Sequence, residues 1–254
     1  MMKINGNDLV LGVDLDLWNS YGVKHPITTS ILPEINSHMI ICGMSGSGKT
    51  FLEQIIIRNL ILANEEDVSI FYFADYKGDD SFAYLRNAPR YYSYNNTLKA
   101  LDEVYAILNS RLGGDLDRTP VTLIWDEYMA NILSLTNVDK KLAAVTMNKV
   151  SEILLMGRSM AVRIIVSCQR PDAVAFPVGS RLNYGVVIIL GNFQRSIYEM
   201  LIPDYKDHQI EGRTFNRGEG TVLLQGTQTQ LHYLKVPLVR HIDKMQQLCL
   251  KALS

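Results

Sequence analysis

The chain has 254 residues, 47% of them hydrophobic and 20% charged, so it is long enough to bury a full core. Its 25 basic and 26 acidic side chains give a net charge of −1, which excludes a histone-like or polybasic protein but allows a local basic patch. No apolar run reaches the roughly 18 residues of a membrane span, and the first residues lack the apolar stretch of a signal peptide. We therefore expect a cytoplasmic protein that reaches a membrane only through partners.

The three cysteines, Cys42, Cys168 and Cys249, lie far apart in the sequence and form no CxxC pair. An odd number of separated cysteines argues against a disulfide framework and against a zinc site. We expect each of them to be a small buried residue in a reducing compartment.

Short apolar runs rich in β-branched residues alternate along the chain with longer segments of helical period. The apolar runs predict buried strands, and a Gly-Thr-Gln turn between the last two predicts a closing hairpin. In chain order, the strands are expected at 39–42, 68–74, 121–125, 161–168, 184–190, 220–225 and 229–236. The helices are expected at 51–63, 98–112, 139–158 and 240–253.

Most of the predicted strands are apolar throughout rather than alternating, which indicates burial on both faces. Because they are interleaved with helices, they predict an α/β protein with a mostly parallel sheet between helical layers, closed by a C-terminal β-hairpin. No internal repeat and no Pro/Ser-rich linker marks a domain boundary.

The segment GMSGSGKT at 43–50 matches the phosphate-loop pattern GxxxxGK[ST] in full and lies between a predicted strand and a predicted helix. Glycines let successive backbone N–H groups point at phosphate oxygens, and the helix start adds its positive dipole. Lys49 is expected to reach the β- and γ-phosphates of ATP, and the Thr50 hydroxyl to hold Mg²⁺. The expected ATP contacts are Gly43, Met44, Ser45, Gly46, Ser47, Gly48, Lys49, Thr50 and Phe51.

Asp126 and Glu127 directly follow the apolar strand at 121–125. Ligands of open α/β sheets bind at the carboxyl ends of the strands, so we expect Asp126 to act on Mg²⁺ and Glu127 to orient or deprotonate the attacking water. The alternative is an acid pair that caps a helix. One predicted strand, at 68–74, separates the phosphate loop from the acid strand. This order resembles P-loop NTPases with an inserted strand and a catalytic glutamate, and it favours hydrolysis over binding alone.

Five segments occur in an order that resembles the FtsK/SpoIIIE motor family, within the FtsK–HerA group of ring-forming DNA pumps. They are HMIICGMSGSGKT (38–50), FADYKGDD (73–80), WDEYMA (125–130), LLMGRSMAVRIIVSCQRPD (154–172) and NRGEGTVLL (216–224). The similarity covers roughly residues 36–236. It implies a RecA-like P-loop core, with a motor domain at 36–238 between a short N-terminal segment, 1–35, that packs on the core and a C-terminal helix within 239–254.

The resemblance also implies roles for residues outside the phosphate loop. Gln169 matches a polar sensor of the family near the γ-phosphate, and its amide suits this role because it both donates and accepts hydrogen bonds. The alternative is a strand-end residue whose hydrogen bonds are made with the backbone. A ring motor needs an arginine from the neighbouring subunit to neutralise charge on the transferred phosphoryl group. We rank Arg181 first and Arg158 second, ahead of Arg170 and Arg195.

Asp75 and Lys77 match the D-x-K turn of the same family, although an exposed turn explains them as well. Other basic and aromatic residues are candidates for contact with nucleic acid, by phosphate pairing or base stacking. A solvated surface is the commoner role for such cations, and a half-buried strand for such tyrosines. These candidates are Lys140, Lys141, Lys149, Arg86, Arg90, Tyr91, Tyr92 and Tyr94.

The expected activity is ATP hydrolysis coupled to movement of double-stranded DNA by a hexameric ring. Cell-division pumps of this family add membrane helices, a linker and a winged-helix domain, none of which is recognisable here. The expectation is therefore a minimal motor of a mobile element, acting in transfer, packaging or replication with a relaxase, replication or membrane-complex protein. The alternatives are a protein-export ATPase like the type VII secretion motors, and an ATP-gated docking module for a replication or relaxase protein.

Overall fold

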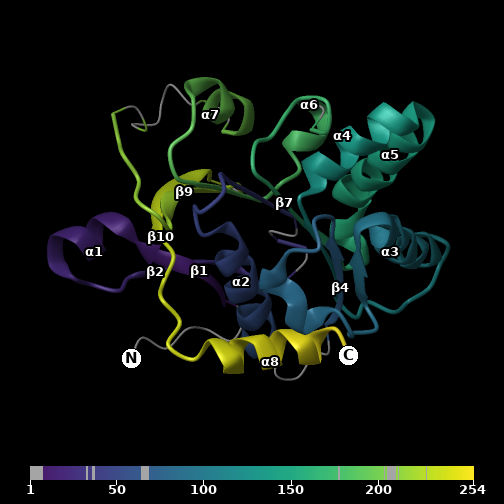
Figure 1. Cartoon of the computed structure of the whole chain (residues 1–254), viewed down its shortest axis with the longest axis horizontal. Helices are drawn as coiled ribbons and strands as arrows, with labels where there is room; N and C mark the ends of the chain where they lie inside the picture. Colours follow the sequence, from purple (N-terminus) through teal and green to yellow (C-terminus); the bar gives the residue numbers. More distant parts are fainter. Residues whose placement is uncertain are drawn as a thin grey trace.

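The computed structural model describes residues 8–32, 34–35, 38–63, 69–176, 178–202, 204, 210, 212–226 and 228–254. One ten-stranded sheet runs through this part of the chain in the order β2-β1-β10-β9-β8-β3-β7-β6-β4-β5 (Figure 1). The strands are β1 (Asp8–Asp14), β2 (Pro26–Ser30), β3 (Met39–Gly43), β4 (Ile70–Asp75), β5 (Tyr91–Ser93), β6 (Val121–Asp126), β7 (Val162–Cys168), β8 (Val186–Leu190), β9 (Glu219–Leu224) and β10 (Gln230–Lys235).

Helices follow or separate the strands along most of the chain. The α-helices are α1 (Leu15–Tyr21), α2 (Lys49–Ala63), α3 (Thr97–Leu112), α4 (Tyr128–Val138), α5 (Lys140–Met156), α6 (Val178–Arg181), α7 (Arg195–Leu201) and α8 (Ile242–Ala252). Short 3₁₀ helices are η1 (Asp80–Leu85), η2 (Tyr94–Asn96) and η3 (Gly157–Met160). None of the helices in the described part of the chain has the length and apolar character needed to cross a bilayer.

The sheet is parallel on one side and antiparallel on the other. From β8 through β3, β7, β6 and β4 to β5, every neighbouring pair is parallel. From β8 through β9, β10 and β1 to β2, every pair is antiparallel. The predicted mostly parallel α/β fold is confirmed, and the β9–β10 hairpin lies in the same sheet; Thr227, in its predicted turn, lies outside the described residues.

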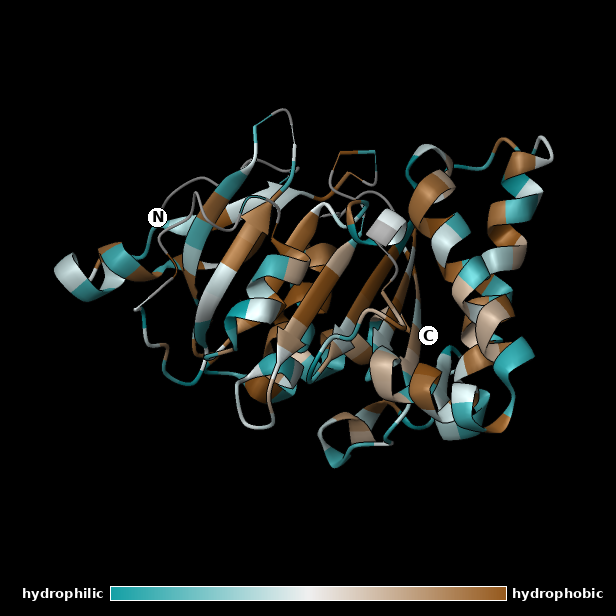
Figure 2. Cartoon of the chain, turned by 90° about the horizontal axis from the view of Figure 1, so that it is seen from above, coloured by the Kyte–Doolittle hydropathy of each residue, from teal (hydrophilic) through white to brown (hydrophobic). Residues whose placement is uncertain are grey.

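Two hydrophobic cores cover the two faces of the sheet, because successive side chains of a strand point to opposite faces. In β6, Trp125 belongs to the core that includes residues of α3, α4, α5 and α7, whereas Ile124 belongs to the core that includes residues of α2, α8 and η1. Figure 2 shows the central strands as largely hydrophobic, with helices of mixed character outside them. This double burial explains why the central strands are apolar throughout.

Several elements were absent from the sequence-based expectations. In the N-terminal segment, β1 pairs with β10 and β2 pairs with β1, so this segment extends the sheet. Helix α4 ends at Val138 because Asp139 has an extended backbone and caps α5, accepting from the N–H groups of Lys141 and Leu142 at 2.9 and 3.0 Å. The helix expected at 139–158 is therefore α5 followed by η3, and α4 precedes it as a separate helix.

Candidate nucleotide site

The phosphate loop connects the end of β3 to the start of α2 at the carboxyl edge of the parallel strands. Gly46 and Gly48 adopt φ angles of +81° and +100°, a region in which side chains cause strain. A Cβ on Gly43 would collide with the Ser47 hydroxyl oxygen, so only glycine fits the first position of the loop without a shift. Of the two glycines that the pattern fixes, Gly48 is thus required by its backbone conformation and Gly43 by the close Ser47 side chain.

The loop is braced by the segment that precedes β9. Gly218 N–H donates to the Ser47 carbonyl oxygen at 2.8 Å. The segment is itself fixed, because Glu219 accepts from the Asn216 N–H at 2.9 Å and pairs with Lys235 at 2.7 Å. The stretch NRGEG, which contributed to the family resemblance, therefore packs against the phosphate loop.

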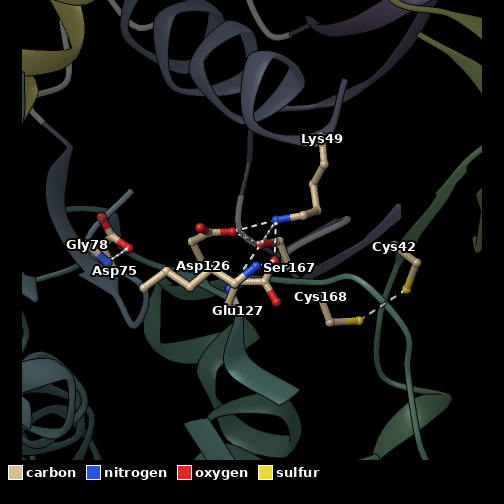
Figure 3. A network of polar contacts seen from close by, with 9 residues as sticks. Cys42, Lys49, Asp75, Gly78, Asp126, Glu127, Ser167 and Cys168 are labelled. Atoms are coloured by element: carbon tan, nitrogen blue, oxygen red, sulfur yellow. Dashed lines mark hydrogen bonds and ion pairs between the residues drawn. The ribbon is translucent and has the colours of Figure 1, made fainter. Parts of the chain in front are cut away.

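Lys49 joins the phosphate loop to the acid strand (Figure 3). Its Nζ lies 2.6 Å from Asp126 Oδ1 and 3.2 Å from Glu127 Oε1, and it donates to Ser167 Oγ at 3.3 Å. The Ser167 hydroxyl in turn donates to Asp126 Oδ1 at 2.5 Å. The two motifs that the sequence predicts to act together are thus in direct contact.

This contact takes place in a buried setting. Burial by itself would lower the pKa of Lys49, but the negative charges of Glu53, Asp126 and Glu127 outweigh it and raise the pKa well above its ordinary value. Lys49 therefore carries its full charge. A fixed cation beside a glycine loop and a helix start is suited to bind phosphate.

Sequence reasoning missed two polar members of this cluster, Glu53 and Ser167. Glu53 is 1% exposed, and neither of its carboxylate oxygens has a hydrogen-bond partner among the residues that the structure describes. Burial, followed by repulsion from Asp126, raises its pKa to about 8, against the attraction of Lys49. The available signals were a charge one helical turn after Lys49 and a hydroxyl within an otherwise apolar strand.

The oxygen-rich character of the cluster also fits Mg²⁺, which prefers carboxylate, hydroxyl and water ligands. Thr50 is in the first turn of α2, and Asp126 ends β6 with its carboxylate beside Lys49. The buried Glu53 carboxyl, whose oxygen atoms have no hydrogen-bond partner among the described residues, adds two further oxygen atoms to this region. The residues present are thus compatible with a magnesium-bound nucleotide.

Glu127 occupies the position just before α4, yet it does not cap that helix. Its backbone has φ 57° and ψ 38°, a left-handed conformation that is strained for a residue with a side chain, and its carboxylate makes no capping hydrogen bond. Instead the carboxylate contacts Lys49 and, at 3.1 Å, Lys77 Nζ. The helix-cap alternative is therefore wrong for Glu127.

The D-x-K turn follows β4 and lies against the acid strand. Asp75 accepts from Gly78 N–H at 2.8 Å and from the Tyr91 hydroxyl, and Tyr76 N–H donates to the Asp126 carbonyl at 3.4 Å. Burial raises the pKa of Asp75, although these hydrogen bonds oppose the shift. The turn brings Lys77 to Glu127, so it is more than an exposed connection.

The remaining candidates do not join this cluster. Gln169 directly follows β7 and is half-buried at the edge where the phosphate loop lies. Arg181 ends α6 and donates to the Met200 carbonyl at 3.3 Å, whereas Arg158 is exposed in η3, before β7 begins. Arg170 donates to the Gln194 side chain, and Arg195 pairs with Glu199. The roles of Gln169 and of the arginines stay predictions.

Most candidates for nucleic-acid contact have partners within the chain. Lys149 pairs with Asp102, Arg86 pairs with Asp80, and Arg90 donates to the carbonyls of Phe71 and Ala252. Lys140 and Lys141 are exposed at the start of α5.

The three candidate tyrosines differ in burial. Tyr91 and Tyr92 are half-buried in β5 and donate to carboxylates. Tyr94 is exposed and stacks on Tyr76.

The cysteines are buried and free, as expected, but two of them are neighbours in space. Cys42 on β3 and Cys168 on β7 face each other in register, and their sulfur atoms lie 3.5 Å apart beside the cluster (Figure 3). In the described part of the chain, no group of three or more His, Cys, Asp and Glu residues is arranged to hold a metal ion.

The chain is 25% identical over 227 residues to the FtsK domain-containing protein YdcQ of Bacillus subtilis strain 168. The chain is thus similar in sequence to a protein with an FtsK domain. The match covers 83% of this chain and 45% of YdcQ, so the chain spans less than half the length of that relative. No protein-family model matches the chain. The predicted resemblance to the FtsK group is confirmed by this relative.

Solved structures confirm a RecA-like P-loop fold. The conjugation coupling protein TcpA of pCW3, in its monomer form with ATPγS, has a TM-score of 0.68 and 17% identity, covering 97% of this chain and 71% of TcpA. ATPases 2 and 3 of EssC from Geobacillus thermodenitrificans have a TM-score of 0.66 and 12% identity, covering 99% of this chain and 49% of that one. The cytoplasmic domain of EccC, a type VII secretion ATPase of Thermomonospora curvata, has a TM-score of 0.62 and 16% identity, and the match covers 100% of this chain and 32% of that one.

Proposed function

We propose that the chain is an ATP-hydrolysing motor domain of the FtsK/SpoIIIE type that moves double-stranded DNA for a mobile element, in transfer, packaging or replication. The observation that carries this proposal is the contact of Lys49, from the phosphate loop, with both Asp126 and Glu127. The similarity to an FtsK domain-containing protein supports the FtsK/SpoIIIE type. Free cysteines support a reducing compartment such as the cytoplasm.

In the proposed reaction, backbone N–H groups of residues 43–50 and the Lys49 ammonium bind the phosphates of ATP. Thr50 and Asp126 would hold Mg²⁺, which would neutralise charge on the phosphates. Glu127 orients a water molecule and takes its proton as the water oxygen bonds to the γ-phosphorus and the bond to the ADP oxygen breaks. ADP and inorganic phosphate are the products.

The assembled form that we propose is a hexameric ring with the site between subunits. Arg181 or Arg158 of the neighbouring subunit then neutralises the transferred phosphoryl group, and Gln169 senses the γ-phosphate. The motor domain is proposed for 36–238, with 1–35 packed on it and a C-terminal helix within 239–254. We further propose DNA as the polymer, and a relaxase, replication or membrane-complex protein as partner.

The deciding test is steady-state ATP hydrolysis by the chain with double-stranded DNA, with single-stranded DNA and with no DNA. We expect stimulation by double-stranded DNA that is lost in Lys49→Ala, which removes the phosphate contact. Glu127→Gln should still bind a fluorescent ATP analogue but turn over at least about 100-fold more slowly.

Other results would contradict parts of the proposal. Unchanged hydrolysis in Glu127→Gln would refute the role of that carboxylate. Slow ATP hydrolysis whose rate does not change when DNA is added, together with normal ATP binding, would refute a DNA motor. Stimulation by a secreted polypeptide would then indicate an export ATPase, and a stable partner complex without stimulation would indicate a docking module.

A further inference from the structure

Two lysines from different parts of the chain share one oxygen of the Glu127 carboxylate. Lys49 Nζ lies 3.2 Å from Glu127 Oε1, and Lys77 Nζ lies 3.1 Å from the same atom. Lys49 belongs to α2 and contacts Asp126 at the shorter distance of 2.6 Å. In the proposed function, the Lys49 side chain turns to the phosphates of ATP. Its longer contact, with Glu127, is then the one more readily lost.

Lys77 reaches Glu127 because the turn that carries it is rigidly built. Strands β4 and β6 are parallel neighbours with Asp75 opposite Asp126, so the residues after each strand leave the sheet side by side. The Asp75 carboxylate closes the turn on Gly78, which has φ +65°. The turn is therefore fixed independently of Lys77, whose side chain is 41% exposed.

The Glu127 carboxylate depends on such a contact for its orientation. Its backbone is held in the strained left-handed region, and no helix-capping hydrogen bond fixes the side chain. The Glu127 side chain is 5% exposed, so water has little access to hold it. When Lys49 leaves, Lys77 is the other lysine paired with this carboxylate in the part of the chain that the structure describes.

We propose that Lys77 is a positioning residue that holds the Glu127 carboxylate in place once Lys49 has turned to the nucleotide phosphates. This inference rests on the ATPase function proposed above and deepens it. It gives the D-x-K turn a role at the reacting centre through Glu127, without contact between Lys77 and ATP. A misplaced general base loses rate rather than substrate affinity.

The test is Lys77→Met in the full chain, with kcat and KM for ATP and the affinity for a fluorescent ATP analogue measured together. We expect kcat to fall about 10- to 100-fold while KM and analogue affinity stay within about twofold. Lys77→Arg, which keeps the charge, should restore most of kcat. Lys99→Met, which removes an exposed lysine on α3, is the matched control and should behave as the parent chain.

A second measurement separates this inference from the proposed function. Thermal unfolding with ATPγS bound is compared for Lys77→Met, Glu127→Gln and the double variant. Non-additive shifts in Tm are expected, because either change alone breaks the same contact. Additive shifts, or an unchanged kcat in Lys77→Met, would overturn the inference. If the parent chain shows no Lys49-dependent hydrolysis, the proposed function fails, and the additivity of the Tm shifts alone decides the role of Lys77.

Discussion

At the scale of single residues, Lys49 compensates the negative charge of the buried carboxylates beside it. Glu53, Asp126 and Glu127 all act on its pKa, and all three are buried. Removing one member of a buried charge cluster lowers the free energy of unfolding by more than the intact cluster contributes to it, because the remaining charges are left uncompensated. We therefore expect Lys49 to stabilise the fold of the nucleotide-free chain, in addition to its proposed role in ATP binding.

Lys49→Met is accordingly expected to lower the free energy of unfolding by about 3 kcal/mol in the absence of nucleotide. Adding MgCl₂ should recover part of this loss, because a divalent cation compensates the same carboxylates. Urea unfolding with and without MgCl₂ measures both effects, with Lys99→Met as the control for loss of a lysine. A variant as stable as the parent would show that the carboxylates accommodate the loss by taking up protons.

The residue scale also shows what the sequence could establish. Motif spacing and strand order were sufficient to bring Lys49, Asp126 and Glu127 to one sheet edge, because carboxyl ends of parallel strands converge there. Glu53 and Ser167 were not predictable, because their types and positions also suit an exposed helix turn and a strand hydroxyl. Their part in the cluster follows from the register of β6 and β7 and from the rotation of α2, which are tertiary properties.

At the scale of elements, the opposite edge of the sheet holds a buried histidine just before β3. His38 Nδ1 accepts from the Ile164 N–H at 3.2 Å, and the His38 carbonyl accepts from the Val186 N–H at 3.1 Å, so this residue links β3 to both β7 and β8. Burial, followed by the positive charges of Arg163 and Arg158, lowers the pKa of His38 to about 3.

This lowered pKa makes stability dependent on pH in one direction. The unfolded chain binds a proton on His38 below pH 6.5, whereas the folded chain does so only near pH 3, so stability is lost as the pH falls between these values. Between pH 7 and pH 5, this residue should cost about 2 kcal/mol of unfolding free energy. His38→Asn, whose carbonyl oxygen can accept from Ile164, should flatten the profile by that amount in urea unfolding. Parallel profiles would contradict the assigned pKa.

Element boundaries were predicted where glycine or charge marks them, and missed where register decides them. Helix α3 ends at Leu112, before Gly113, as expected from the sequence. Helix α5 begins at Lys140 after its cap Asp139, close to the expected start at 139, whereas the preceding helix α4 was not predicted. Strands β1 and β2 were missed because β1 is placed in the sheet by pairing with β10, more than 200 residues away in the chain, and β2 by pairing with β1.

At the scale of the whole molecule, the site lacks one expected group. In the described part of the single chain, Arg181 is bonded to the Met200 carbonyl and Arg158 is exposed in η3, and neither is bonded to the Lys49 cluster. If an arginine acts, it is proposed to come from a neighbouring subunit. ATP hydrolysis per chain should then depend on assembly, so the specific activity should rise with protein concentration.

Mixing two inactive variants tests this directly. Arg181→Ala and Glu127→Gln should each be inactive alone, whereas a mixture pairs an intact Glu127 with an intact Arg181 across some interfaces. In an equimolar mixture, about a quarter of the interfaces should be complete, and hydrolysis should return to a corresponding level. Absence of recovery for Arg181→Ala, with recovery for Arg158→Ala, would assign the arginine to η3. No recovery with either would refute an arginine supplied by these residues in trans.

The buried cysteines have a practical consequence. Cys42, Cys168 and Cys249 are all fully shielded, and burial raises the pKa values of Cys168 and Cys249, so little thiolate is available for alkylation. A cysteine placed on the surface, for example Lys99→Cys on α3, should react with maleimide dyes far faster than any native thiol. Site-specific fluorophores can thus be attached to the otherwise unaltered chain, and distance changes between the subunits of the proposed ring can be measured during turnover.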